Sequence, residues 1–136
     1  MDTGSLAKAD FEQLSEFRYQ LRRFLRFSED ICRSEGVTPL QYLLLLHIRG
    51  YAGRDWATVG ELADRLQAQH HGVVALVSRC ESLGWVERRP GRDDRRVVEI
   101  HLTPAGEARV GRLAHAHRNE LATMGDGFAV PRPNPD

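Results

Sequence analysis

Residues 69–84 read Gln-His-His-Gly-Val-Val-Ala-Leu-Val-Ser-Arg-Cys-Glu-Ser-Leu-Gly, and this stretch decides the fold of the chain. Its apolar residues recur at the spacing of an α-helix and form one stripe: Val73, Leu76, Val77, Cys80 and Leu83. We expect that stripe to pack inward. The opposite face is small and polar: His71, Ala75, Ser78 and Ser82. A helix with such an outward face can lie close to another surface.

Two short strands are predicted after this helix, at residues 85–89 and 96–102, on either side of a Pro-Gly-Arg-Asp-Asp-Arg turn at residues 90–95. Five arginines lie between residues 88 and 96 against two aspartates, which gives a local excess of three positive charges. A short helix with a small outward face beside a basic hairpin is typical of a winged helix-turn-helix protein that reads DNA.

The segment before the central helix completes this arrangement. Thr58-Val-Gly-Glu61 is a capping box that begins a helix at residues 59–66, and residues 67–69 form the turn that follows. A similar signal, Thr38-Pro-Leu-Gln41, begins a helix to about residue 49 that is apolar nearly all round, so we expect it to be buried. Trp56-Ala57 is expected to add a short strand to the hairpin.

Long helices are predicted at both ends of the chain. Residues 9–33 carry an amphipathic pattern with four phenylalanines in its stripe, more apolar surface than one small domain needs to cover. This excess indicates burial against a second copy of the chain. Thr103-Pro104 caps a last helix that runs to about Met124, and the chain after Gly125 is rich in proline.

The predicted fold class is therefore mainly α with a small β-hairpin (α+β), a winged helix-turn-helix with N- and C-terminal dimerisation helices. Residues 1–8 are expected to be a mobile N-terminus, and residues 9–36 and 104–124 to be dimerisation helices. Residues 37–103 form the DNA-binding domain, and residues 125–136 are expected to be a disordered Pro-rich tail.

Composition excludes several other classes of protein. Apolar runs such as residues 43–46 are too short to span a membrane, and no leader is visible, so we expect a soluble cytoplasmic protein without a membrane partner. Phosphate loops, hydrolase motifs and paired metal ligands are absent, so we expect no enzyme, no metal and no cofactor. The net charge of zero counts against DNA binding, but affinity for phosphates depends on the local basic patch.

Four segments together resemble the MarR family of bacterial transcriptional regulators: residues 58–66, 73–86, 88–96 and 102–106. The resemblance covers about residues 9–122. It implies a homodimer that is held by its first and last helices and binds a pseudo-palindromic operator in double-stranded DNA. Each recognition helix, the central helix within residues 69–84, would enter a major groove. Each wing, the basic hairpin of residues 85–102, would reach a flanking minor groove. Many relatives release DNA when a small phenolic ligand, an oxidant or a metal binds.

The sequence departs from the family pattern at two places. Family members usually have a further helix after the one that begins at Thr103, where this chain has a Pro-rich tail. Many members also carry Thr-Arg at the positions of Val74 and Ala75, where the Arg reads a base. Its absence shifts the expected readout to Gln69, His71, apolar contact from Val74 and shape readout by the wing.

The DNA interface is predicted to include residues of the recognition helix and of the wing: Gln69, His70, His71, Val74, Ser78, Arg79, Arg92, Asp94, Arg95 and Arg96. Arg92 and Arg95 at the wing tip are expected to enter a narrow minor groove. The family likeness implies that Asp94 braces Arg96 rather than touching DNA.

A pocket for a small aromatic effector is expected where the first helix meets residues 40–48, lined by Phe17, Tyr42 and His47. A ligand-responsive repressor is our main hypothesis, with an activator left open. One alternative is a winged-helix protein-interaction module without DNA binding, which the zero net charge and Ala75 would favour. The other is a redox-sensing regulator that acts through Cys32 or Cys80. Cys80 lies on the inward stripe, which suits a small buried residue, whereas the position of Cys32 near the end of the first long helix decides less.

Overall fold

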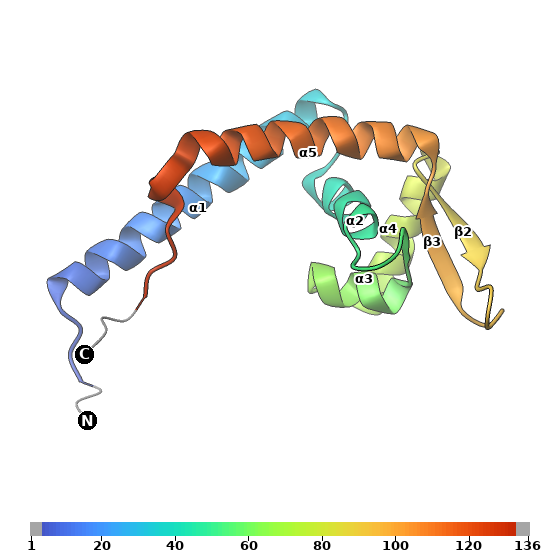
Figure 1. Cartoon of the computed structure of the whole chain (residues 1–136), viewed down its shortest axis with the longest axis horizontal. Coiled ribbons are helices and arrows are strands. Elements are labelled where there is room, and N and C mark those ends of the chain that lie inside the picture. Colours follow the sequence, from blue (N-terminus) through green and yellow to red (C-terminus); the bar gives the residue numbers. More distant parts are fainter. Residues whose placement is uncertain (1–3, 133–136) are drawn as a thin grey trace.

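The computed structural model describes residues 4–132, and within them the chain has five α-helices, a three-stranded antiparallel sheet and one 3-10 turn (Figure 1). Helices α1 (Lys8–Ser34) and α5 (Pro104–Met124) lie side by side as a long bar. A compact head, residues 37–103, hangs from one end of that bar. This is the mainly α fold with a small sheet that the sequence predicts. None of the described helices is long and apolar enough to cross a membrane.

Capping side chains set where the helices of the head begin. At α2 (Pro39–Arg49), Thr38 Oγ1 accepts from the N–H of Gln41, whose own side chain accepts from the N–H of Thr38. Thr58 and Glu61 make the same reciprocal pair at α3 (Val59–Leu66). Both helices therefore begin where their capping boxes predict. The central helix α4 (His70–Ser82) follows after a three-residue turn, as expected for a helix-turn-helix.

The sheet places its strands in the order β1-β3-β2. The predicted strand Trp56–Ala57 (β1) pairs with β3 (Val98–Leu102), which also pairs with β2 (Val86–Pro90). We call β2, β3 and the turn between them the wing. β3 begins two residues later than predicted, because Val97 N–H donates to Asp94 O and Val97 O accepts from Gly91 N–H, which keeps this residue in the turn.

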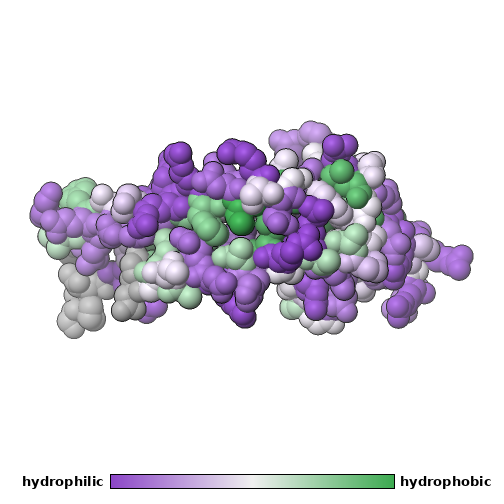
Figure 2. Space-filling model, turned by 90° about the horizontal axis from the view of Figure 1, so that it is seen from above, coloured by the Kyte–Doolittle hydropathy of each residue, from purple (hydrophilic) through white to green (hydrophobic). Residues whose placement is uncertain are grey.

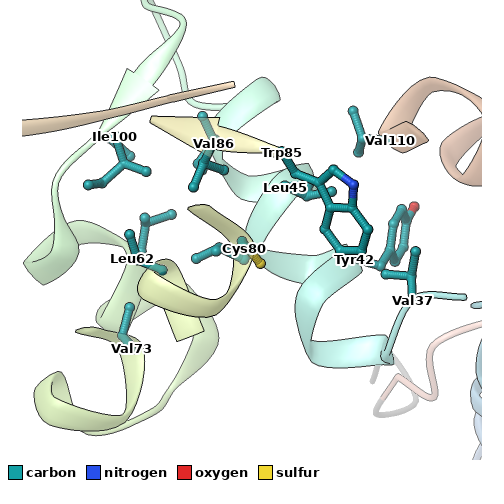
Figure 3. Packing of buried hydrophobic residues seen from close by; sticks show 14 of the residues in the cluster. Val37, Tyr42, Leu45, Leu62, Val73, Cys80, Trp85, Val86, Ile100 and Val110 are labelled. Carbon is teal, nitrogen blue, oxygen red and sulfur yellow. The ribbon is translucent and has the colours of Figure 1, made fainter. Parts of the chain in front are cut away.

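Side chains from every element of the head meet in one core (Figure 3). Val73, Val77 and Cys80 of the α4 stripe are fully buried there, and Leu76 packs against its edge. Leu83 is the exception to the predicted stripe, since 38% of it is exposed. Leu83 is the cap residue at the end of α4, one position after Ser82.

Residues 4–132 leave the far half of the bar partly uncovered. Phe11 and Leu14 belong to the predicted apolar stripe of α1, yet they are 56% and 46% exposed. Seen from above, apolar side chains form several patches along the molecule, one of them near its middle (Figure 2). Phe17, Phe24 and Ile31, further along the stripe, are half-buried.

The segment after α5 turns back onto the bar. Gly125 has a φ of +53°, a conformation that favours glycine, and residues Gly125–Phe128 form the 3-10 turn η1. The ring of Phe128 lies 5.9 Å from that of Phe17 and 6.0 Å from that of Phe24, measured between centroids. This differs from the disorder predicted for these four residues, because a phenylalanine within the Pro-rich tail finds an aromatic surface to bury.

Both ends of the described chain lack regular structure. Residues 4–7 and 129–132 belong to no helix or strand. The predictions of a mobile start and a disordered end for residues 1–3 and 133–136 lie outside the described residues.

Candidate nucleic-acid interface

The outward face of α4 is exposed along its whole length. The six residues predicted to touch DNA from this helix and its cap are all exposed: Gln69, His70, His71, Val74, Ser78 and Arg79. Before the helix, Gln67 holds the left-handed conformation at the end of α3, with a φ of +51°, and its side-chain amide donates to Asp64 O at 2.7 Å. This conformation turns the chain sharply between the two helices of the motif.

The wing tip carries two cations that have no partner in the described part of the chain. Arg92 and Arg95 are exposed and make no hydrogen bond or ion pair among residues 4–132. Arg96 differs, because Asp94 accepts from its main-chain N–H at 3.0 Å and from its guanidinium at 3.1 Å. These hydrogen bonds lower the pKa of Asp94, so the carboxylate stays ionised. The contact expected between Asp94 and Arg96 is therefore present.

A contact between the wing and α4 was not predicted from the sequence. Arg88 of β2 reaches the side chains of Glu81 and Ser78 on α4, which joins the two parts of the interface. No spacing rule could have found it, because Glu81 and Arg88 lie on different elements on either side of a chain reversal.

A second unpredicted cluster fixes the start of α3. The guanidinium of Arg54 lies 4.4 Å from the ring centroid of Tyr51 and 3.8 Å from that of Trp56, and it pairs with Glu61. Burial opposes the ionisation of Glu61, but hydrogen bonds from Thr58, Tyr51 and Arg54 outweigh it and hold its pKa below the usual value. The cluster therefore ties the loop before β1 to the helix-turn-helix.

The structure brings two of the three predicted effector residues to one aromatic cluster. Tyr42 stacks on His117 of α5 with 4.4 Å between ring centroids, and Phe24 meets the edge of the same imidazole. Phe17 joins this cluster through Phe128. His47 lies elsewhere, on the side of α3, where burial and the charge of Arg65 lower its pKa.

His117 is the buried centre of that cluster and was not predicted as a site residue. Its Nδ1–H donates to Leu113 O at 2.6 Å, which leaves Nε2 to accept from the Ser28 hydroxyl at 2.8 Å. Ser28 and His117 are far apart in the sequence, so no local pattern links them. A pocket of about 420 Å³ lies at the α1–α2 junction, lined by Glu29, Arg33 and residues 36–39.

Neither cysteine has the surroundings of a reactive thiol. Cys32 and Cys80 are both fully buried. Burial raises the pKa of Cys32, partly offset by a hydrogen bond with Ser28, and raises the pKa of Cys80 to about 11, partly offset by Arg79. Among residues 4–132 no group of three His, Cys, Asp or Glu side chains is placed to hold a metal ion.

An exposed helix beside a basic hairpin, both carried on one small core, defines a winged helix-turn-helix protein. The sequence model of the protein family named MarR family matches residues 35–97, the part that contains this helix and most of the wing. The chain belongs to the MarR family of transcriptional regulators.

Known proteins agree with this assignment. The chain is 30% identical over 124 residues to a protein of Thauera aromatica named as a putative transcriptional regulatory protein for the hcr operon, covering 83% of this chain and 73% of that protein. The structure of a MarR family protein from Bacillus stearothermophilus has the same fold, with a TM-score of 0.76 at 23% identity over 92% of this chain and 86% of that one.

A structure that contains DNA is also similar. A mutant of S. aureus MepR bound to an oligodeoxyribonucleotide has a TM-score of 0.67 at 20% identity, covering 79% of this chain and 78% of that one. At this identity the likeness concerns the fold alone. The curated relatives that carry a function in their names are transcriptional regulators rather than enzymes.

Proposed function

We propose that this protein is a homodimeric, ligand-responsive repressor that binds a pseudo-palindromic operator in double-stranded DNA. The observation that carries the proposal is the pair of unpartnered wing arginines, Arg92 and Arg95, beside the exposed face of α4. Unneutralised arginines at the tip of a hairpin suit a narrow minor groove, where the negative potential is enhanced. The small residues Ala75 and Ser78 let the backbone of α4 approach base edges in the major groove.

Dimerisation is supported by the uncovered half of α1. Monomeric proteins rarely leave a continuous apolar stripe in water, and Leu6, Phe11 and Leu14 are each about half exposed here. A partner that covers this stripe would present two copies of α4. Two recognition helices on one face of B-DNA must lie about one helical turn apart, roughly 34 Å.

The aromatic cluster around His117 supports a response to a small aromatic ligand. It joins α1, α2 and α5, so a molecule that separates these rings would move the head relative to the bar. The spacing of the two recognition helices would then change. The ligand would weaken DNA binding only to the extent that it prefers the altered dimer shape.

The direct test is selection of duplexes from a random pool with the full chain, followed by gel retardation and sedimentation. We expect a selected site with two inverted half-sites and a complex of two chains per duplex. A protein that sediments as a monomer and retards no duplex at low salt would contradict the proposal. That outcome would instead favour a winged-helix module that binds proteins.

A further inference from the structure

Arg88 lies at the centre of β2, and its side chain and main chain both bind α4. Its Nη1 donates to Glu81 Oε1 at 2.5 Å, its main-chain N–H donates to Glu81 Oε2 at 3.3 Å, and its Nη2 donates to Ser78 Oγ at 3.0 Å. We propose that Arg88 is a positioning residue that holds the recognition helix and the wing in one relative orientation, as a clamp with Glu81 and Ser78. The proposal rests on the function proposed above.

The place of the clamp in the fold explains why it would control orientation. Only residues 83–85 connect α4 to β2, and β2 is an edge strand of the sheet. An edge strand has main-chain N–H groups without a strand partner. Here the carboxylate of Glu81 accepts a hydrogen bond from the main-chain N–H of Arg88. The carboxylate thus binds both the backbone and the side chain of the strand, which a single surface ion pair does not do.

The clamp also sets the hydrogen-bonding direction of Ser78, which lies on the exposed face of α4. Because Ser78 Oγ accepts from the guanidinium, its hydroxyl proton is free to point away from Arg88. Ser78 is then a donor toward the outside, suited to a phosphate oxygen or to an acceptor on a base edge. Without Arg88 the hydroxyl could rotate and would offer no fixed donor.

Charge separates this role from that of the wing-tip arginines. The guanidinium of Arg88 is neutralised by Glu81 and its side chain is only 31% exposed, whereas Arg92 and Arg95 are exposed and make no ion pair with any described residue. A residue that acts as a cation toward phosphates should strengthen DNA binding when its carboxylate partner is removed. If Arg88 instead acts by positioning, removal of the same carboxylate should weaken specific binding.

Glu81→Ala therefore gives results of opposite sign for the two roles. The experiment measures the affinity of the full chain for its selected duplex and for a scrambled duplex of equal length, at one salt concentration. We expect the ratio of specific to non-specific affinity to fall roughly tenfold, as for the loss of one charge-assisted hydrogen bond, while binding to the scrambled duplex stays equal or rises. Higher affinity for both duplexes with an unchanged ratio would overturn the positioning role.

Arg88→Lys is the second variant, and Arg112→Ala is the control. Lysine keeps the charge but cannot reach Glu81 and Ser78 in a fork, so we expect it to lose specificity as Glu81→Ala does. Full activity of Arg88→Lys would show that charge alone matters. Arg112 pairs with Glu35 away from the wing, and its removal should leave the affinity ratio unchanged.

Hydrogen exchange of the free protein tests the clamp without DNA. We expect the amide of Arg88 and the wing to exchange faster in Glu81→Ala than in the wild type, with the core of α2 unchanged. Equal exchange in the wing would overturn the inference. If the wild-type chain bound no duplex, both the proposed function and the role of Arg88 in recognition would fail. If the wild type bound its duplex and both Glu81→Ala and Arg88→Lys kept the wild-type ratio of specific to non-specific affinity, only the inference about Arg88 would fail.

Discussion

At the scale of single residues, charge at the wing is divided between arginines that are neutralised and arginines that are free. Arg88, Arg89 and Arg96 each pair with a carboxylate. Arg92 and Arg95 do not pair within the described chain, and this division decides which residues can add to DNA affinity. The zero net charge of the whole chain therefore says little about the field at the wing tip.

Replacing Arg92 or Arg95 by Ala should weaken binding to both the selected and the scrambled duplex. Each arginine that neutralises one phosphate contributes about one unit to the slope of log affinity against log salt, so each variant should lower that slope by about one. Titrations at several salt concentrations measure it. An unchanged slope would remove these residues from the interface, and Arg112→Ala serves as the neutral comparison.

The buried thiol of Cys80 should make the folded protein less stable at alkaline pH. Burial raises the pKa of this thiol from 9.0 to about 11, so between these values the folded state holds a proton that the unfolded state has released. The stabilisation is complete below pH 9 and is lost as the pH rises toward 11, by about 1.4 kcal/mol per pH unit for one group. Urea unfolding at pH 8 and pH 10 should show this loss, and Cys80→Ala should reduce it. An identical loss in the variant would assign it to other groups.

At the scale of elements, two glycines of α5 sit in opposite surroundings. A Cβ on Gly106 would lie 2.0 Å from Trp85 O, so the start of α5 packs directly on the backbone that leads into the wing. A Cβ on Gly111 would meet nothing within 4 Å. One helix therefore offers a matched pair of substitutions.

Gly106→Ala should destabilise the protein by about 2 kcal/mol or more, because α5 must move away from Trp85. Gly111→Ala should stabilise it by about 0.5–1 kcal/mol, since alanine favours a helix interior. Denaturant unfolding of both variants measures the difference. Equal effects would mean that α5 does not pack against Trp85 as closely as described.

Elements with local causes could be predicted from the sequence. Thr38, Thr58 and Thr103 begin their helices where their capping signals lie, and the α4 stripe packs inward up to the end of that helix. Each of these features depends on residues within four positions of one another. The exposed face of α4 follows from the same period, so the candidate interface could be outlined before the structure.

Contacts between distant elements could not be predicted. The Arg88 clamp depends on how β2 leaves α4, and the meeting of Ser28 with His117 depends on how α5 packs along α1. Phe128 was missed for a related reason, since proline content describes the tail alone and not the aromatic surface on which it folds.

At the scale of the whole molecule, the bar and the head differ in how completely their apolar side chains are buried. The core of the head is closed with the help of Cys32 from α1 and of Val110 and Leu113 from α5, whereas Phe11 and Leu14 at the far end of α1 stay exposed among the described residues. The proposed dimer would complete the bar and leave the head as described. The same contact would set the distance between the two copies of α4.

Leu14→Glu should therefore yield a folded monomer of 15.4 kDa with weak affinity for the selected duplex. The charge would be buried without a partner at the proposed interface, which strongly disfavours association. Sedimentation gives the mass, and Val98→Glu is the control for the mass alone, because Val98 is 43% exposed but lies on the wing. A wild type that is already monomeric, or a dimeric Leu14→Glu, would contradict the assignment of this surface.

Both tryptophans of the chain lie in the head, Trp56 beneath the guanidinium of Arg54 and Trp85 beneath that of Arg109. Intrinsic fluorescence during heating thus reports the head and its contact with the start of α5, whereas far-ultraviolet circular dichroism is weighted toward the long helices α1 and α5. If the bar is held by a second chain, dilution should lower the dichroism midpoint more than the emission midpoint. The positions of the two indoles would therefore let dissociation of the dimer be distinguished from unfolding of the chain in one sample, with no label added.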